Sequence, residues 1–287
     1  MSYVSSSFRS SSAFGAQVAL DDDRLRRIAP SIFAEQAHVS RSDKYAYIPT
    51  SLVLEGMRKE GFVAVRANQG RSRIAGKAEY TKHMIRFRHG SYIGTESLGQ
   101  VVPEIVLVNS HDGTSAYHLI AGLFRVRCLN GLVVCESETA DIRVPHKGQV
   151  VDNVIEGAFT VIEESKSAVE RAESWGQLQL TRDEKHIMAE AAHVLRFGDA
   201  EGNTETVIEP DQLLRARRTD DRADNLWITH NVIQENVIRG GLHAWGRDAN
   251  NRQRRVTTRE VKNIDGDVKL NRALWMLSQR MAELKGV

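Results

Sequence analysis

The sequence has few cysteines, few prolines and no long apolar run among its 287 residues. Runs such as 105-IVLV-108 are far shorter than the roughly 20 apolar residues that a bilayer span needs, so no integral membrane protein is expected. With two cysteines and no leader-like start, we expect a reducing cytoplasm and no stabilising disulfide. Six residues separate Cys128 from Cys135, which fits neither a redox pair nor a zinc knuckle, and both are predicted to be buried.

Sequence motifs for hydrolytic or metal chemistry are also missing. The chain has no glycine loop for phosphates, no nucleophile elbow and no cysteine and histidine framework. His111, Asp112 and His118 lie close together in the sequence and could form a metal or general-base site. Turn formation by Asp112 and Gly113 is the simpler interpretation. We therefore expect a protein that is not an enzyme and that needs no cofactor or metal.

Periodicity divides the chain into a strand-rich part and a helix-rich part. Strands are predicted at 62–67, 78–88, 102–110, 115–127, 132–135 and 141–144. Helices are predicted at 49–61, at two apolar stripes within 151–169 and 187–195, at 223–239 and at 268–284. This order predicts an α+β fold, in which an antiparallel sheet of about five strands has helices packed on one face and a helical C-terminal region follows.

Composition along the chain predicts three segments. The first twelve residues contain seven serines, so residues 1–30 are expected to be a flexible arm. The α+β core domain is expected over residues 31–200, and a helical extension packed on that core over 201–287.

Charge is distributed unevenly, although the net charge is only +2. Residues 58–88 contain nine basic side chains and two acidic ones, and two further basic clusters occur at 215-RARRTDDR-222 and 247-RDANNRQRRVTTR-259. Segregated positive charge favours a polyanionic partner, whereas incidental clusters on a solvated surface are the alternative.

Several predicted strands alternate arginine with bulky apolar residues, which places the two kinds on opposite faces of a sheet. If the strands share one sheet, an exposed face carries a row of guanidinium groups that can follow a nucleic-acid backbone. The predicted phosphate-binding residues are Arg86, Arg88, Arg125, Arg127 and Arg143, with Arg71, Arg73 and Lys77 in support from a loop. The alternative is that Glu79, Glu104 or Asp141 neutralises the row across the strands.

The helix predicted at 223–239 aligns Asn231, Glu235 and Arg239 at four-residue steps. This pattern indicates either a functional polar cluster or a simple pair between Glu235 and Arg239 on a solvated side, with Gly240 ending the helix. A metal-dependent nuclease that uses Glu235 and nearby histidines is a further reading, but one carboxylate without a partner makes a poor nuclease site.

Two stretches resemble a known family. Residues 106–134, VLVNSHDGTSAYHLIAGLFRVRCLNGLVV, and 213–241, LLRARRTDDRADNLWITHNVIQENVIRGG, are similar to the plasmid- and phage-borne family called domain of unknown function 932. That resemblance implies residence on mobile DNA and no particular activity. Residues 47–67, followed by basic strands and a long helix, also look like the core of single-strand annealing recombinases. This second likeness implies ring-forming homo-oligomers that hold single-stranded DNA by its backbone and hydrolyse no nucleotide.

The combined expectation is a cytoplasmic, non-catalytic protein of a mobile element that binds single-stranded DNA without sequence preference and promotes annealing, as a homo-oligomer. The alternative is an interaction protein of a phage or plasmid that counteracts a host defence or replication factor, with the arginine face meeting an acidic host protein.

Overall fold

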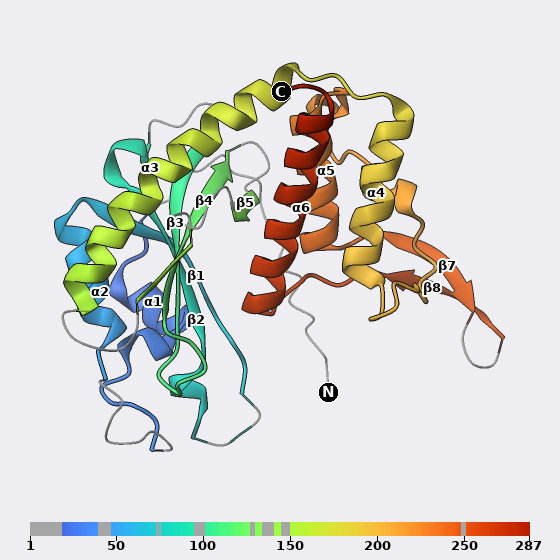
Figure 1. Cartoon of the computed structure of the whole chain (residues 1–287). Helices are drawn as coiled ribbons and strands as arrows, with labels where there is room; N and C mark the ends of the chain where they lie inside the picture. The colour runs from blue at the N-terminus through green and yellow to red at the C-terminus, as the bar shows by residue number, and fades with distance from the viewer. Residues whose placement is uncertain are drawn as a thin grey trace.

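The computed structural model describes residues 19–39, 47–72, 74, 76–94, 101–126, 130–133, 141–144, 150–247 and 251–287. Arg73, Arg127 and both cysteines, for which the sequence made predictions, lie outside these residues. The described part confirms the predicted α+β fold: an antiparallel sheet, helices against it and a helical C-terminal region (Figure 1).

The main sheet has six antiparallel strands within the described residues. They are β1 (Phe62–Gln69), β2 (His83–His89), β3 (Val101–Asn109), β4 (Tyr117–Arg125), β5 (Asn130–Val133) and β6 (Asp141–Val144). The order is β1-β2-β3-β4-β5, and β6 pairs with the other half of β4. The predicted hairpin between β3 and β4 is present. Because β2 pairs with β3, the hairpin belongs to the same sheet as β1.

Three helices cover the first face of the sheet. They are α1 (Asp22–Ile28), α2 (Thr50–Lys59) and α3 (Val150–Gln177). The long α3 runs over the sheet and reaches the C-terminal helices (Figure 1). Its contact with the sheet is close, because a Cβ atom at Gly157 would lie 2.9 Å from Leu119 Cδ1. The segment expected to be an arm thus contributes α1, whose Leu25 is buried.

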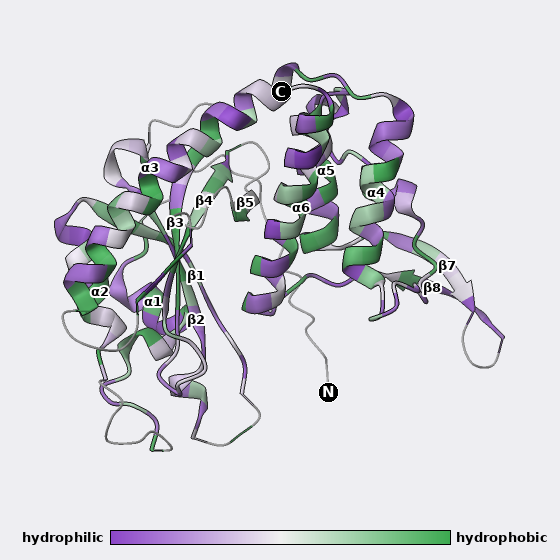
Figure 2. Cartoon of the chain, in the orientation of Figure 1, coloured by the Kyte–Doolittle hydropathy of each residue, from purple (hydrophilic) through white to green (hydrophobic). Residues whose placement is uncertain are grey.

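The C-terminal part, residues 178–287, contains three α-helices, two short 3-10 helices (Pro210–Leu214 and Thr219–Arg222) and a small hairpin, and we call it the helical lobe. Its elements are α4 (Arg182–Phe197), α5 (Leu226–Arg239), β7 (His243–Arg247), β8 (Gln253–Thr257) and α6 (Ile264–Leu284). Much of α5 consists of hydrophobic residues, which are green in Figure 2. Both α4 and α6 contact this helix. A domain boundary at residue 200 would therefore separate α4 from the helices on which it packs. No described helix has both the length and the apolar composition needed to cross a bilayer.

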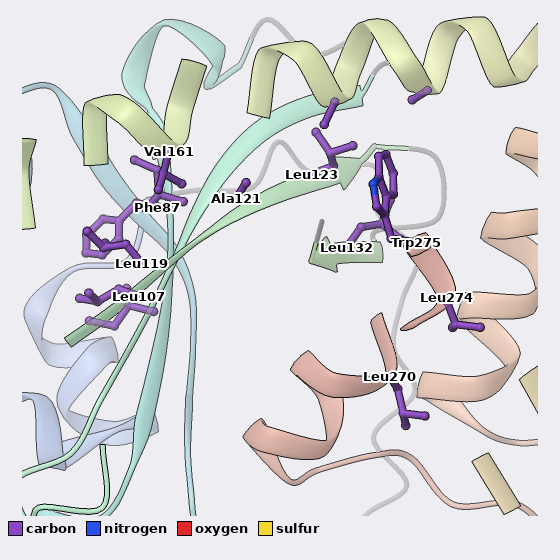
Figure 3. Packing of buried hydrophobic residues seen from close by; sticks show 14 of the residues in the cluster. Phe87, Leu107, Leu119, Ala121, Leu123, Leu132, Val161, Leu270, Leu274 and Trp275 are labelled. Atoms are coloured by element: carbon purple, nitrogen blue, oxygen red, sulfur yellow. The ribbon is translucent and has the colours of Figure 1, made fainter. Parts of the chain in front are cut away.

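One hydrophobic core connects the sheet to the helical lobe. It extends from Phe87 and Leu119 beneath Val161 of α3 to Leu132 of β5 and Trp275 of α6 (Figure 3). A second, smaller cluster lies on the opposite face of the sheet. There Ile264 and Val268 of α6 pack on apolar side chains of the central strands: Met84, Val106, Val108, Ile120 and Val133. Because α6 covers part of this second face, the face is not a free surface.

The apolar stripe predicted for α4 does not form its buried side. Ile187, Val194 and Leu195 are exposed, whereas Met188 and Ala192 point into the core. The helix is amphipathic as predicted, but small residues and Met188 pack against α5 and α6, and the larger side chains lie outside. The hairpin of β7 and β8 was not predicted at all.

Candidate functional site

The predicted row of arginines is divided between the two faces of the sheet. Arg86 and Arg88 lie on the face of Phe124, since the Arg88 guanidinium stands 4.4 Å from the centre of that ring. Arg125 follows Phe124 in β4 and therefore points to the other face, with Leu123 and Ala121 of the main core. The prediction of one shared arginine face is thus wrong. The reason is visible in the sequence, because Leu119 and Tyr117 have the same parity as Arg125.

Arg86 and Arg88 are also buried, which contradicts the expected phosphate contacts. Glu104 on β3 accepts from Arg86 Nη1 at 3.1 Å and from Arg88 Nη2 at 2.6 Å. Their exposed fractions are 3% for Arg86, 0% for Arg88 and 1% for Glu104. Arg86 additionally donates to the carbonyl of Leu132 at 3.2 Å. The neutralising carboxylate considered as the alternative is therefore present, and it is Glu104.

Arg125 belongs to a second ionic network, which joins the sheet to the helical lobe. Asp221 accepts from Arg125 Nη2 and from Arg218 Nη1, both at 2.8 Å. Arg218 also donates two hydrogen bonds of 2.8 Å to Glu235, which accepts a third from Arg239 at 2.9 Å. Burial alone would raise the pKa of Asp221, but the hydrogen bonds and charges of Arg218 and Arg125 hold it below its usual value. The network is thus a set of compensated charges and stabilises the junction of the lobes.

The polar cluster predicted on α5 is only partly assembled. Glu235 and Arg239 pair as expected, but Glu235 is buried rather than on a solvated side. Asn231 is buried too and donates to the carbonyl of Trp227 at 2.7 Å, away from the carboxylate. Glu235 is surrounded by guanidinium groups, which suits charge compensation and not metal-dependent hydrolysis.

The other residues predicted to act together have separate partners. His111 lies beside Thr50, Asp112 accepts from Thr114, and His118 contacts Asp141. No group of three histidine, cysteine or acidic side chains suited to a metal occurs among the described residues. Of the supporting basic residues, Lys77 pairs with Asp112 at 3.3 Å and Arg71 is exposed. Arg143, which was predicted as part of the arginine row, is exposed on β6.

An accessible basic surface is found instead on the hairpin of β7 and β8. Trp245 is 65% exposed and lies opposite Arg255, and Arg247 lies on the same face two residues further on. The other face is held against the protein, because a Cβ atom at Gly246 would stand 3.1 Å from Val207. The hairpin therefore presents an indole and two guanidinium groups outward, and we call this the hairpin face.

A cleft separates β1 and β2 from α5 and α6, and we call it the interlobe cleft. Its volume is about 1100 Å³. The side chains around it include five basic groups, two carboxylates and four amides: Arg66, Arg71, Arg86, Arg239, Lys262, Glu260, Asp267, Asn68, Gln69, Gln234 and Asn263. It is therefore mainly cationic, and it gathers residues from both lobes.

Charges in the interlobe cleft perturb one another. Burial raises the pKa of Asp267, although the neighbouring Arg86 and Arg66 oppose this shift. Desolvation by the walls of the cleft, followed by repulsion from Arg86, lowers the pKa of Arg66. The cleft thus disfavours the charged forms of both a carboxylate and a guanidinium.

The hairpin face was not among the predicted sites, and of the residues around the interlobe cleft only Arg71, Arg86 and Arg239 were predicted to be functional. The basic run at 247–259 was recognised in the sequence, but Trp245 just before it was not connected with it. A tryptophan in a short segment next to the turn residues Asn250 and Asn251 was the available signal for an exposed hairpin. No comparable signal in the sequence connects Arg66 with the cleft residues of α5 and α6, such as Gln234 and Asp267, which are far from it along the chain.

Comparisons with known proteins identify relatives whose functions are not described by their names. The chain is 44% identical over 279 residues to the UPF0380 protein YafZ of Escherichia coli (strain K12), which covers 95% of this chain and 97% of that relative. It is 43% identical over 279 residues to the UPF0380 protein YfjQ of the same organism, with the same coverage.

No solved structure matches, so the likeness to single-strand annealing recombinases stays a prediction. A family model matches residues 37–275, which include both stretches that carried the resemblance. The chain therefore belongs to the family described as "Domain of unknown function (DUF932)".

Proposed function

We propose that this protein binds single-stranded nucleic acid, DNA in the first place, through the hairpin face. The observation that carries the proposal is the exposed Trp245 between arginines on a projecting hairpin. This retains the function expected from the sequence but moves it from the buried arginines of the sheet to another surface.

The chemistry of the hairpin face matches an unpaired strand. An exposed indole can stack on a base, which is worth about 1–3 kcal/mol per base and tolerates any sequence. The flanking Arg247 and Arg255 can donate to phosphate oxygens on either side of that base. Residues 251–259 contain four arginines and no acidic residue, so the approaching backbone meets little repulsion.

Fluorescence anisotropy with a labelled 20-residue oligothymidylate tests the proposal. We expect Trp245→Ala to weaken binding at least tenfold and Trp245→Phe to retain most of it, because phenylalanine still stacks. We expect Arg255→Ala to weaken binding and to lower the slope of log K against log salt by about 1. Arg222→Ala is the matched control, since Arg222 is exposed but lies before α5 and outside the hairpin.

A folded Trp245→Ala protein that binds the oligonucleotide as tightly as the parent contradicts the proposal. Equal binding of a duplex and of the single strand contradicts the stacking role of Trp245. If the protein binds no oligonucleotide but captures an acidic host protein in a pull-down that Arg255→Ala abolishes, the hairpin face serves the alternative function of an interaction protein.

Annealing on a mobile element and self-assembly are further parts of the same proposal. The exposed apolar side of α4, formed by Ile187, Val194 and Leu195, is a surface through which copies could join. We expect light scattering to find an oligomer and Leu195→Glu to dissociate it. We also expect the parent protein to speed the pairing of complementary oligonucleotides, and an unchanged pairing rate contradicts the annealing role.

A further inference from the structure

Arg66 reaches the interlobe cleft because of an irregularity in β1. The pairing of β1 with β2 shifts between Ala64 and Arg66, so that Arg66 stands opposite Arg86. Without the extra residue, Arg66 would follow the alternation onto the core face with Ala64. The bulge instead brings two guanidinium groups together on adjacent strands, both at the cleft.

The positive charge of Arg66 is not balanced by an ion pair. Arg86 opposite it is held by Glu104, but no carboxylate oxygen of the described residues lies within 4 Å of the Arg66 guanidinium. Arg71 and Lys262, at the same cleft, also make no ion pair within the described part of the chain. Arg66 is exposed at the cleft. An unpaired cation beside a second cation is stabilised by an incoming anion, and phosphate oxygens fit a guanidinium fork.

The opposite wall of the cleft offers an oriented acceptor. Asn271 donates to Asp267 Oδ1 at 2.8 Å, and its own carbonyl oxygen accepts from Gln234 at 2.9 Å. This chain fixes the Asp267 carboxylate on α6, facing the arginines of the sheet across the cleft. A carboxylate there repels a bare phosphate but accepts hydrogen bonds from hydroxyl or amino groups.

Size and chemistry together favour a ligand larger than a phosphate ion. The cleft, at about 1100 Å³, is slightly larger than the range of roughly 300–1000 Å³ that is typical of small-molecule sites. A phosphate at Arg66 with a hydroxyl or amino group at Asp267 requires a molecule that carries both anionic and donor groups.

We propose that the interlobe cleft binds a nucleoside phosphate, with the phosphates at Arg66 and Arg71 and the nucleoside hydroxyl or amino groups at Asp267. This site is separate from the hairpin face and does not depend on the function proposed for it.

Isothermal titration calorimetry of the full chain tests the site with adenosine 5′-diphosphate, inorganic pyrophosphate and adenosine. We expect adenosine 5′-diphosphate to bind at least tenfold more tightly than pyrophosphate or adenosine. Arg66→Gln should weaken the binding of the diphosphate at least tenfold. Arg143→Gln is the matched control, because Arg143 is an exposed arginine of the same sheet that lies outside this cleft, and it should leave the affinity within twofold.

Asp267→Asn separates the two halves of the site. The substitution should weaken the binding of adenosine 5′-diphosphate several-fold, whereas the affinity for pyrophosphate should stay the same or increase. No binding of the diphosphate at millimolar concentration, or full binding by a folded Arg66→Gln protein, overturns the proposal. Pyrophosphate binding as tightly as the diphosphate overturns the assignment of a nucleoside.

The same variants separate this site from the hairpin face. Trp245→Ala should keep the affinity for adenosine 5′-diphosphate, and Arg66→Gln should keep the affinity for oligothymidylate. If the diphosphate displaces the oligonucleotide and Arg66→Gln weakens both, the cleft holds the nucleic-acid strand itself, and the proposal of a separate nucleotide site is overturned.

Discussion

Gly131 on β5 is the residue on which the buried guanidinium of Arg86 depends. A Cβ atom at Gly131 would lie 2.6 Å from Arg86 Cζ, and Arg86 cannot retreat because Glu104 and the Leu132 carbonyl hold it. We expect Gly131→Ala to lower the free energy of unfolding by about 1–3 kcal/mol, as for other overpacked sites. Urea denaturation measures the change.

Gly176 near the end of α3 is the control for that substitution. A Cβ atom there meets nothing within 4 Å. We expect Gly176→Ala to leave stability unchanged or to raise it by up to about 1 kcal/mol, because alanine favours a helix. Equal stabilities of the two alanine variants would show that Arg86 is not confined by Gly131.

Two buried histidines make stability depend on pH. Burial, aided by the nearby His111, lowers the pKa of His83 to about 3, and burial lowers the pKa of His230 to about 4. In the unfolded chain each histidine titrates near pH 6.5, so below that pH the unfolded state binds more protons than the folded state. Their contribution is complete above pH 6.5 and is lost as the pH falls to about 4 for His230 and to about 3 for His83.

Denaturation at a series of pH values checks this prediction. Each histidine should lower the free energy of unfolding by about 1.4 kcal/mol per pH unit between the unfolded and folded pKa values. His230→Gln should make the dependence between pH 6 and pH 4.5 less steep by about that amount. An unchanged slope in the folded variant would contradict a neutral, buried His230.

At the scale of elements, α4 begins with a complete capping box. Thr181 Oγ1 accepts from the Glu184 amide at 3.2 Å, and Glu184 Oε2 accepts from the Thr181 amide at 2.7 Å. We expect Thr181→Ala to destabilise the protein by about 1 kcal/mol and Thr181→Ser to cost much less, because serine keeps the acceptor. Thermal unfolding of the two variants measures the difference, and equal losses would mean that the cap contributes little.

The strands of the sheet could be predicted because each strand has its own alternation of apolar and polar residues, which can be recognised without knowledge of its neighbours. Residues 84–88 predicted β2, and Ile85 and Phe87 are indeed in the core. This alternation does not predict a bulge such as the one before Arg66, and it does not predict which element covers the second face of the sheet. Arg86 is covered by Gly131 and Leu132 of β5 and Arg88 by the ring of Phe124, and such long-range contacts leave no local pattern.

The candidate sites were harder to predict for a related reason. Basic clusters show where charge is concentrated in the sequence, but a carboxylate distant in sequence decides whether each charge is available. Glu104 and Asp221 neutralise three of the predicted phosphate contacts. Arg255, in a run noted only for its charge, is exposed next to Trp245.

At the scale of the whole molecule, the contacts that join the sheet to the helical lobe include two of different kinds. One is the shared core, in which Trp175 of α3 lies 4.5 Å from Trp275 of α6, measured between ring centres. The other is the buried pair of Arg125 on β4 with Asp221, which precedes α5. Because the core is continuous, we expect the lobes to unfold together, with a single transition in calorimetry.

Asp221→Ala tests whether the two lobes still unfold in a single transition when the ion pair with Arg125 is removed. The substitution removes a buried negative charge beside Arg125 and Arg218 and should cost about 3–5 kcal/mol. Glu205→Ala, on an exposed loop of the same lobe, should change stability little. If the lobes form one cooperative unit, Asp221→Ala moves the single transition to lower temperature without dividing it. Two transitions, with only the one from the helical lobe shifted, would mean that the shared core is too weak to couple the lobes and that the Arg125 and Asp221 pair holds them together.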